Sequence, residues 1–202
     1  HRQIHFFYDD EDGEASYASF ISTFSGSNYK ISRKKDIVAI QSTRGKKVVI
    51  YANHPKSELE GQAKLVRLMD SFYRDIQVFV HRGHSYYAMN TIDQIPPRTK
   101  IVFLGSCGSY HNVHEVLGRS ENVHIISSKQ IGTMHVNNPL LYNIAETIRQ
   151  DKDLVWSDLW AKTGKQLARN KDATAKFRDY VAPDKNLGAI FLQAFTKLVT
   201  ED

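Results

Sequence analysis

The sequence has one cysteine, Cys107, among its 202 residues, so no intrachain disulfide can form. No apolar run approaches the roughly 20 residues that a membrane-spanning helix needs, and no signal-peptide pattern opens the chain. We therefore expect no insertion into a membrane. The first residue is His1 rather than methionine, so we expect this sequence to be a piece of a longer chain with flanking domains as partners, and the compartment stays open.

The chain also lacks a strong excess of charge and several familiar site motifs. It has 27 basic and 22 acidic residues, a net charge of +5, and its densest basic run is the short Arg33-Lys34-Lys35. A nucleic-acid interface usually needs a longer cluster with interleaved aromatics, so we predict no nucleic-acid partner. The phosphate loop Gly-x-x-x-x-Gly-Lys and the hydrolase elbow Gly-x-Ser-x-Gly are both missing.

Apolar residues recur along the chain in short strand-like runs and in longer segments of helical period. Asn138 followed by Pro139 is typical of a helix start. The alternation of strands and helices predicts one α/β domain over residues 1–202, with a mostly parallel sheet flanked by helices in three layers. The expected strands cover 3–8, 36–41, 46–51, 76–80, 100–104 and 122–127, and the expected helices cover 14–24, 57–74, 89–94, 110–117, a segment from 138, 157–167 and 186–199.

Two of these strands end in polar segments that contain glycine. The run 76–80 (IQVFV) leads into 81–85 (HRGHS), and the run 100–104 (KIVFL) leads into 105–109 (GSCGS). The residues between them are numerous enough for the crossover of about a dozen that joins parallel strands. Both polar ends can therefore lie at the carboxyl edge of the sheet, where open parallel sheets bind ligands.

These two ends carry a candidate base, His84, and a candidate nucleophile, Cys107. A histidine beside a thiol can take its proton and stabilise the thiolate. Backbone N–H groups at a strand-to-helix turn also favour the thiolate and can bind an oxyanion. His81 competes with His84 for the role of base, but His84 is favoured because it follows Gly83 and lies further from the strand.

The order of strand, Gly-His, crossover, strand and Ser-Cys-Gly-Ser resembles the caspase-like cysteine peptidase superfamily. This group includes caspases, metacaspases, legumains, gingipains, clostripains, separases and CHAT domains. Residues 82–85 (RGHS) line up with the Ser-Gly-His-Gly motif of metacaspases, and residues 105–110 (GSCGSY) line up with Asp-Ser-Cys-His-Ser-Gly. The clear match covers residues 76–109.

The resemblance implies a caspase-like fold and a cysteine endopeptidase that hydrolyses a polypeptide substrate. It implies Cys107 as the nucleophile, His84 as the residue that handles the proton, and no metal or organic cofactor. It further implies an oxyanion hole built from backbone N–H groups of Gly83, Ser85 and Gly108.

Two positions depart from the family pattern. Ser85 stands where the family usually has glycine, and Gly105 stands where relatives often have an acidic or amide residue that shapes the substrate pocket. Cleavage specificity is therefore open. The alternative hypothesis is a catalytically silent caspase-like module used for binding or regulation.

Other polar residues could contribute to a substrate pocket. Asp9, Asp10 and Asp12 follow the first strand, and they lie at the same sheet edge if that strand is parallel. Their carboxylates could hold a basic substrate group. Ser127 and Ser128, at the end of the strand after Cys107, are further candidates.

A zinc site is a third hypothesis. His81 and His84 form one His-x-x-His pair, His111 and His114 form another, and Cys107 lies between them in the sequence. Nitrogen and sulfur ligands suit zinc, and residues three apart share a helix face. No Cys-x-x-Cys or His-Glu-x-x-His motif supports this hypothesis.

Overall fold

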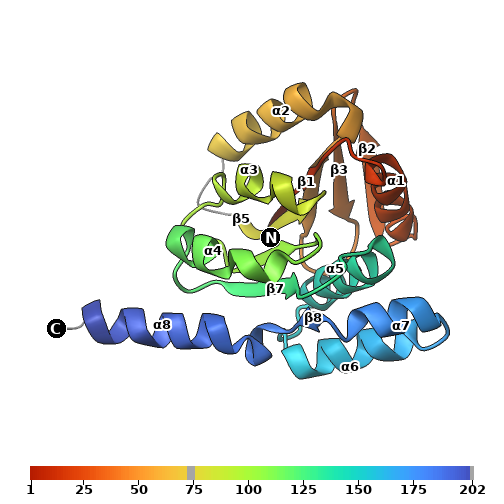
Figure 1. The fold of residues 1–202 in the computed structure, drawn as a ribbon. Coiled ribbons are helices and arrows are strands. Elements are labelled where there is room, and N and C mark those ends of the chain that lie inside the picture. The colour runs from red at the N-terminus through yellow and green to blue at the C-terminus, as the bar shows by residue number, and fades with distance from the viewer. Residues whose placement is uncertain (72–75, 201–202) are drawn as a thin grey trace.

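The computed structural model describes residues 1–71 and 76–200, which form an α/β fold around a mixed eight-stranded sheet (Figure 1). The strand order is β2-β3-β4-β1-β5-β6-β7-β8, and the strands from β4 to β7 are parallel to one another. Antiparallel pairs extend the sheet at both edges. The predicted α/β class and its mostly parallel sheet are confirmed. The strands are β1 (Arg2–Phe7), β2 (Tyr29–Arg33), β3 (Ile37–Ser42), β4 (Val49–Asn53), β5 (Ile76–Arg82), β6 (Ile101–Leu104), β7 (His124–Ser128) and β8 (Tyr180–Val181).

Helices cover both faces of this sheet and leave a hydrophobic core on each side. One core lies under α1, α5, α6 and α7, and the other under α2, α3 and α4 (Figure 1). The helices are α1 (Gly13–Thr23), α2 (Glu58–Asp70), α3 (Ala88–Ile92), α4 (Val113–Arg119), α5 (Met134–Arg149), α6 (Trp156–Leu167), α7 (Lys171–Phe177) and α8 (Leu187–Thr200), with short 3-10 turns η1 (Pro55–Ser57), η3 (Ser85–Tyr87), η4 (Ser109–Asn112) and η5 (Pro183–Lys185). Among the described helices, none is long and apolar enough to cross a bilayer.

Strand β6 shows how the fold fixes the edge that carries Cys107. Ile101 and Phe103 are buried in one core, while Val102 and Leu104 are buried in the other. Each such side chain contributes roughly 1.5–3 kcal/mol on burial, so the strand is held from both faces. The segment that follows β6 is therefore presented from a rigid base.

Helix α5 begins earlier than the sequence predicted. It was expected to start at Asn138 and Pro139, but it starts at Met134, and Pro139 lies inside it. Thr133 caps the helix, and the buried amide groups of Asn137 and Asn138 donate hydrogen bonds to neighbouring elements. These tertiary contacts stabilise a first turn that local propensity does not favour.

Three short elements were not predicted from the sequence. The edge strand β2 is mostly polar, while α7 and β8 are too short for a clear period. Helix α2 ends at Asp70, and its expected end near position 74 lies outside the described residues.

Candidate active site

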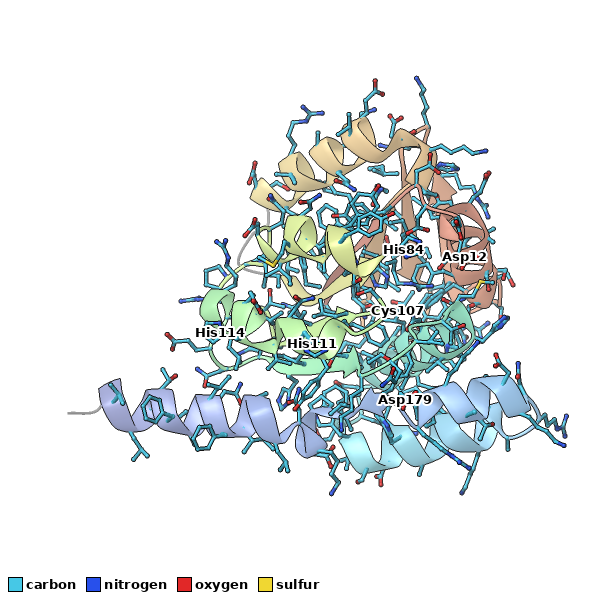
Figure 2. All side chains as sticks on the ribbon, viewed as in Figure 1. Asp12, His84, Cys107, His111, His114 and Asp179 are labelled. Carbon is cyan, nitrogen blue, oxygen red and sulfur yellow. The ribbon has the colours of Figure 1, made fainter. Side chains whose placement is uncertain are left out.

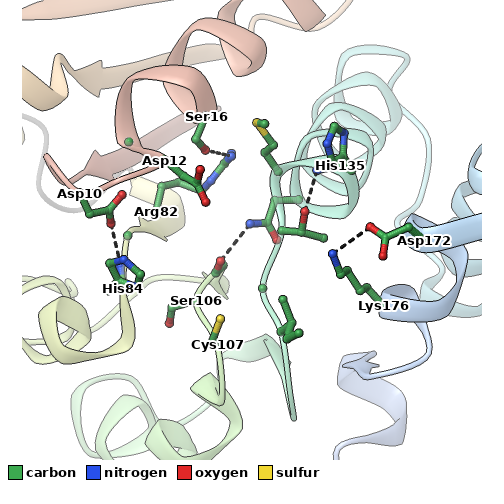
Figure 3. A pocket seen from close by; sticks show the side chains of 18 residues that line it. Asp10, Asp12, Ser16, Arg82, His84, Ser106, Cys107, His135, Asp172 and Lys176 are labelled. Carbon is green, nitrogen blue, oxygen red and sulfur yellow. Dashed lines mark hydrogen bonds and ion pairs between the residues drawn. The ribbon is translucent and has the colours of Figure 1, made fainter. Parts of the chain in front are cut away.

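The carboxyl ends of β1, β5 and β6 and the loop before α5 surround a cleft of about 380 Å³ (Figure 3). His84 follows β5 and Cys107 follows β6; both side chains are exposed, and both line this cleft. The structure thus places the two residues that the sequence proposed as base and nucleophile in the lining of the same cleft. Residues 10–16, 82–84, 105–107 and 131–137 contribute to the lining, together with Asp172 and Lys176 of α7.

Backbone geometry and hydrogen bonds fix the turn that carries Cys107. Gly108 adopts a φ of +60°, a left-handed conformation in which glycine is unstrained, so the chain can reverse directly after the cysteine. The buried Ser109 hydroxyl donates to the Leu104 oxygen at 2.8 Å and accepts from the Ser128 N–H at 3.0 Å. These contacts tie the turn to the ends of β6 and β7.

A chain of buried hydrogen bonds fixes the backbone at His84. The His81 ring lies 3.1 Å from the His84 carbonyl oxygen through Nε2 and 2.8 Å from Thr91 Oγ1 through Nδ1. Because a carbonyl only accepts, Nε2 carries the proton and Nδ1 accepts from Thr91. Thr91 in turn lies 2.9 Å from the Tyr8 hydroxyl, which donates to it. His81 therefore serves as a support for the loop rather than as a group open to substrate.

Burial of this neutral histidine makes stability depend on pH. Burial lowers the pKa of His81 to about 4, whereas an unfolded histidine titrates near 6.5. Between these values the unfolded chain binds a proton that the folded chain does not. We therefore expect the free energy of unfolding to hold its full value above about pH 6.5 and to fall by up to about 3 kcal/mol as the pH drops to about 4.

Urea denaturation at several pH values between 4.5 and 7 tests this expectation. Burial also lowers the pKa of His5, which adds a contribution of the same sign, so His81→Gln should remove part of the pH dependence rather than all of it. An unchanged dependence in His81→Gln would contradict the role given to His81.

Aromatic stacking and one carboxylate position the His84 loop further. The His84 ring stacks on the exposed Tyr86 ring at 5.2 Å, and Tyr87 stacks on Tyr8 at 4.6 Å. The Asp10 carboxylate accepts the His84 backbone N–H at 2.9 Å (Figure 3). The imidazole therefore stands on a loop that is held on several sides.

The amides proposed for the oxyanion hole differ in their contacts. The Gly108 N–H donates to the Gln130 carbonyl at 2.7 Å, so it is occupied in this structure. Gly83 packs against Tyr8, whose ring would lie 2.9 Å from an added Cβ, so this position requires glycine for steric reasons. Ser85 begins η3, and its side chain is exposed.

The glycine at position 105 has a specific neighbour. A Cβ on Gly105 would lie 2.8 Å from Asn137 Nδ2 and 3.0 Å from the His81 oxygen. Asn137 donates to the Gly105 oxygen at 2.9 Å, and the Tyr180 hydroxyl donates to Asn137 Oδ1 at 2.6 Å. The Asn137 amide thus fills the space that an acidic or amide side chain at position 105 would need.

The acidic residues after β1 are divided between two places. Asp10 and Asp12 line the cleft with His84. Asp9 instead lines a separate surface pocket beside Lys35 and Lys56. Since Asp10 is already bound to the His84 amide, Asp12 is the acidic residue of this loop that is left to face the cleft.

Ser127 and Ser128 lie below the cleft rather than in its lining. Both are fully buried, and Ser128 pairs through its N–H with the Ser109 hydroxyl. Ser128 thus supports the turn at Cys107, and because both serines are fully buried, neither is placed to contact a substrate from the surface of the cleft.

Arg82 is a residue of the cleft that sequence reasoning did not single out. Its side chain is only 3% exposed, its guanidinium lies over the Phe7 and Phe20 rings at 5.0 and 5.7 Å, and Nη2 donates to Ser16 Oγ at 2.6 Å. Burial lowers the pKa of Arg82 to about 10, so the group stays cationic at neutral pH. A hydrophobic residue is usual at the end of a buried strand. An arginine at this position of the sequence could therefore have marked Arg82 as a candidate site residue.

The two histidine pairs proposed for zinc lie apart. His81 is buried at the end of β5, while His111 and His114 are exposed on η4 and α4 (Figure 2). Within residues 1–71 and 76–200, no three His, Cys, Asp or Glu residues are grouped so as to hold a metal ion.

No protein-family model and no curated protein matches this sequence, so the residues of the cleft are the basis for assigning a function.

Proposed function

We propose that this chain is a caspase-like cysteine endopeptidase domain in which Cys107 attacks a peptide carbonyl and His84 transfers the proton. One observation carries the proposal: an exposed imidazole and an exposed thiol follow neighbouring parallel strands and line the same cleft. Neighbouring strands lie about 4.8 Å apart, so side chains just beyond their ends can meet over one reacting group. The order of the histidine strand before the cysteine strand agrees with the family resemblance.

The proposed reaction has two stages. His84 takes the thiol proton, the Cys107 sulfur bonds to the substrate carbonyl carbon, and His84 gives the proton to the leaving amine as the peptide bond breaks. The product of this stage is a thioester on Cys107. In the second stage His84 takes a proton from water, the hydroxide attacks the thioester, and the thiol is regenerated with release of the new carboxyl terminus.

The developing negative charge on the carbonyl oxygen needs hydrogen-bond donors near the sulfur. The Gly108 and His84 amides already have acceptors. In the proposed site the backbone N–H groups of Cys107 and Ser85 fill this role. Only the backbone N–H of Ser85 takes part in this role. The exposed side chain of Ser85 can point to solvent.

Digestion of a diverse peptide mixture tests the proposal. We expect new termini, identified by mass spectrometry, with the wild-type chain, and a loss of at least about 1000-fold with Cys107→Ala because the nucleophile is removed. Cys107→Ser is a matched control that keeps a small polar side chain with a far weaker nucleophile. Cleavage that persists in Cys107→Ala, or a folded wild-type chain that cleaves no peptide, would contradict the proposal, and the second result would favour the silent binding module.

A further inference from the structure

Helix α8 exposes an apolar stripe along most of its length. Five large side chains of this stripe are between 44% and 75% exposed, and the exposed Ala194 lies among them. Within the set, residues recur three, four and seven positions apart, which places them on one face of the helix. We call this set the α8 stripe: Leu187, Ile190, Phe191, Ala194, Phe195 and Leu198.

The opposite face of α8 holds the helix against the rest of the chain. Ala189 is buried in the core that lies under α2, α3 and α4. Gln193 Nε2 donates to the carbonyl oxygens of Glu121 and Val123 at 2.9 and 3.1 Å. Figure 1 shows α8 beside α4 and continuing past it towards the C-terminus. The α8 stripe therefore points away from the rest of the chain, on a helix that is fixed from its other side.

The area of the α8 stripe indicates an interface. Together its side chains expose roughly 700 Å², since a single phenylalanine presents about 150–250 Å² when fully exposed. The largest apolar patch of a typical monomer measures about 300–600 Å², whereas each partner of a stable complex buries about 600–1,000 Å². The stripe is therefore large enough to form one half of a dimer interface.

The order of large and small side chains favours an antiparallel pairing of two α8 helices. A twofold axis between Leu192 and Gln193 gives facing layers of the coiled-coil type. The facing pairs along the centre are Leu187 with the partner's Leu198 and Phe191 with the partner's Ala194. A parallel pairing would instead place two phenylalanines in one layer and two alanines in the next, so one layer would be overfilled and the other would hold a void.

The flanks of the antiparallel pairing bring no like charges together. The sequence of α8 contains one charged residue, Lys197, and the axis places it beside the partner's Ile190, which its methylene groups can cover. Phe195 lies beside the partner's Gly188, which has no side chain to oppose the ring. A second copy of the helix therefore matches the α8 stripe in both shape and charge.

We propose that the chain forms a homodimer in which the α8 stripes of two copies pack antiparallel about a twofold axis. Helices with this spacing of apolar residues cross at about 20°. None of the stripe residues lines the cleft, so the inference stands apart from the proposed peptidase function.

Sedimentation equilibrium of the chain at concentrations up to about 100 μM tests the inference. We expect the average mass to rise from 23.1 kDa towards twice that value. Phe191→Glu should weaken the association by at least about 100-fold, because the dimer would then carry two buried charges without partners. Leu59→Glu is the matched control, since it changes an exposed leucine of α2 that lies away from α8 (Figure 1), and it should leave the association unchanged.

Disulfide formation in a Cys107→Ala background tests the orientation of the two helices. A mixture of Leu187→Cys and Leu198→Cys chains should form a mixed disulfide, because these positions face each other across the axis. Leu187→Cys alone should form none. The two copies of position 187 would lie about 16 Å apart along the helices, whereas a disulfide joins Cα atoms less than about 7 Å apart.

A wild-type chain that stays monomeric over the whole concentration range would overturn the inference. A dimer that persists in folded Phe191→Glu, or an equal weakening in Leu59→Glu, would overturn the role of the α8 stripe. A disulfide in Leu187→Cys alone would overturn the antiparallel pairing. Circular dichroism checks the fold, and the wild-type mass and the disulfide pattern decide the matter if Phe191→Glu does not fold. None of these readouts uses peptide cleavage, so a failure of the proposed peptidase would leave the dimer standing.

Discussion

Replacement of His84 by alanine is expected to lower kcat/KM for peptide cleavage by about 100- to 10,000-fold, the usual contribution of a positioned acid–base group. The imidazole is exposed and its ring stacks on the exposed Tyr86, so its removal should leave the fold intact. Peptide cleavage and the thermal midpoint are measured together. His114→Ala is the matched control, because it removes an exposed histidine of α4 that lies away from the cleft (Figure 2).

A fall of less than about tenfold in His84→Ala would contradict the dyad, since general acid–base groups contribute more than this. An equal fall in His114→Ala would also contradict it, because the effect would then not belong to the cleft.

Replacement of Gly132 by alanine is the second large effect we expect. A Cβ at this position would lie 2.5 Å from the Gly105 oxygen and 2.7 Å from the Ser106 carbonyl carbon. Both are backbone atoms that cannot rotate away, so the loop before α5 must move from the segment that carries Cys107. A displacement of about 1 Å near reacting groups can reduce the rate by about 100-fold, which is the fall in kcat/KM that we expect.

Gly118→Ala is the control for this variant. Nothing lies within 4 Å of the added methyl group, and alanine is favoured over glycine in a helix. We expect unchanged cleavage and a slightly higher thermal midpoint. If Gly132→Ala cleaves peptides as fast as Gly118→Ala, the close contact between this loop and the nucleophile segment does not matter for activity.

Local sequence pattern was sufficient to predict the two ends that form the centre of the site. The runs 76–80 and 100–104 are continuous and apolar because both faces of a central strand are buried, and glycine marks where each ends. Their spacing allowed a parallel crossover, and the strands are indeed parallel neighbours. Short-range information was therefore enough to predict that His84 and Cys107 follow neighbouring strands at one edge of the sheet.

The supporting residues could not be found in this way. Asn137 contacts a residue 32 positions earlier and Tyr180 reaches Asn137 across 43 positions, so no local spacing links them. The start of α5 was misjudged for the same reason, because its first turn depends on those distant partners. The surroundings of Arg82 likewise depend on distant elements, because Ser16 of α1 and Phe7 of β1 pack around its guanidinium.

The proposed Cys107–His84 dyad is tested by the rate at which iodoacetamide alkylates Cys107 at pH 6. The rate is compared between the native chain, the native His84→Ala variant and the urea-unfolded chain. An unassisted thiol is almost entirely protonated at this pH and reacts slowly. We predict that the native chain reacts at least about tenfold faster than both other samples, because His84 takes the proton of the Cys107 thiol and so increases the fraction of thiolate. A native rate equal to that of His84→Ala or of the unfolded chain would contradict a Cys107–His84 dyad and with it the proposed peptidase.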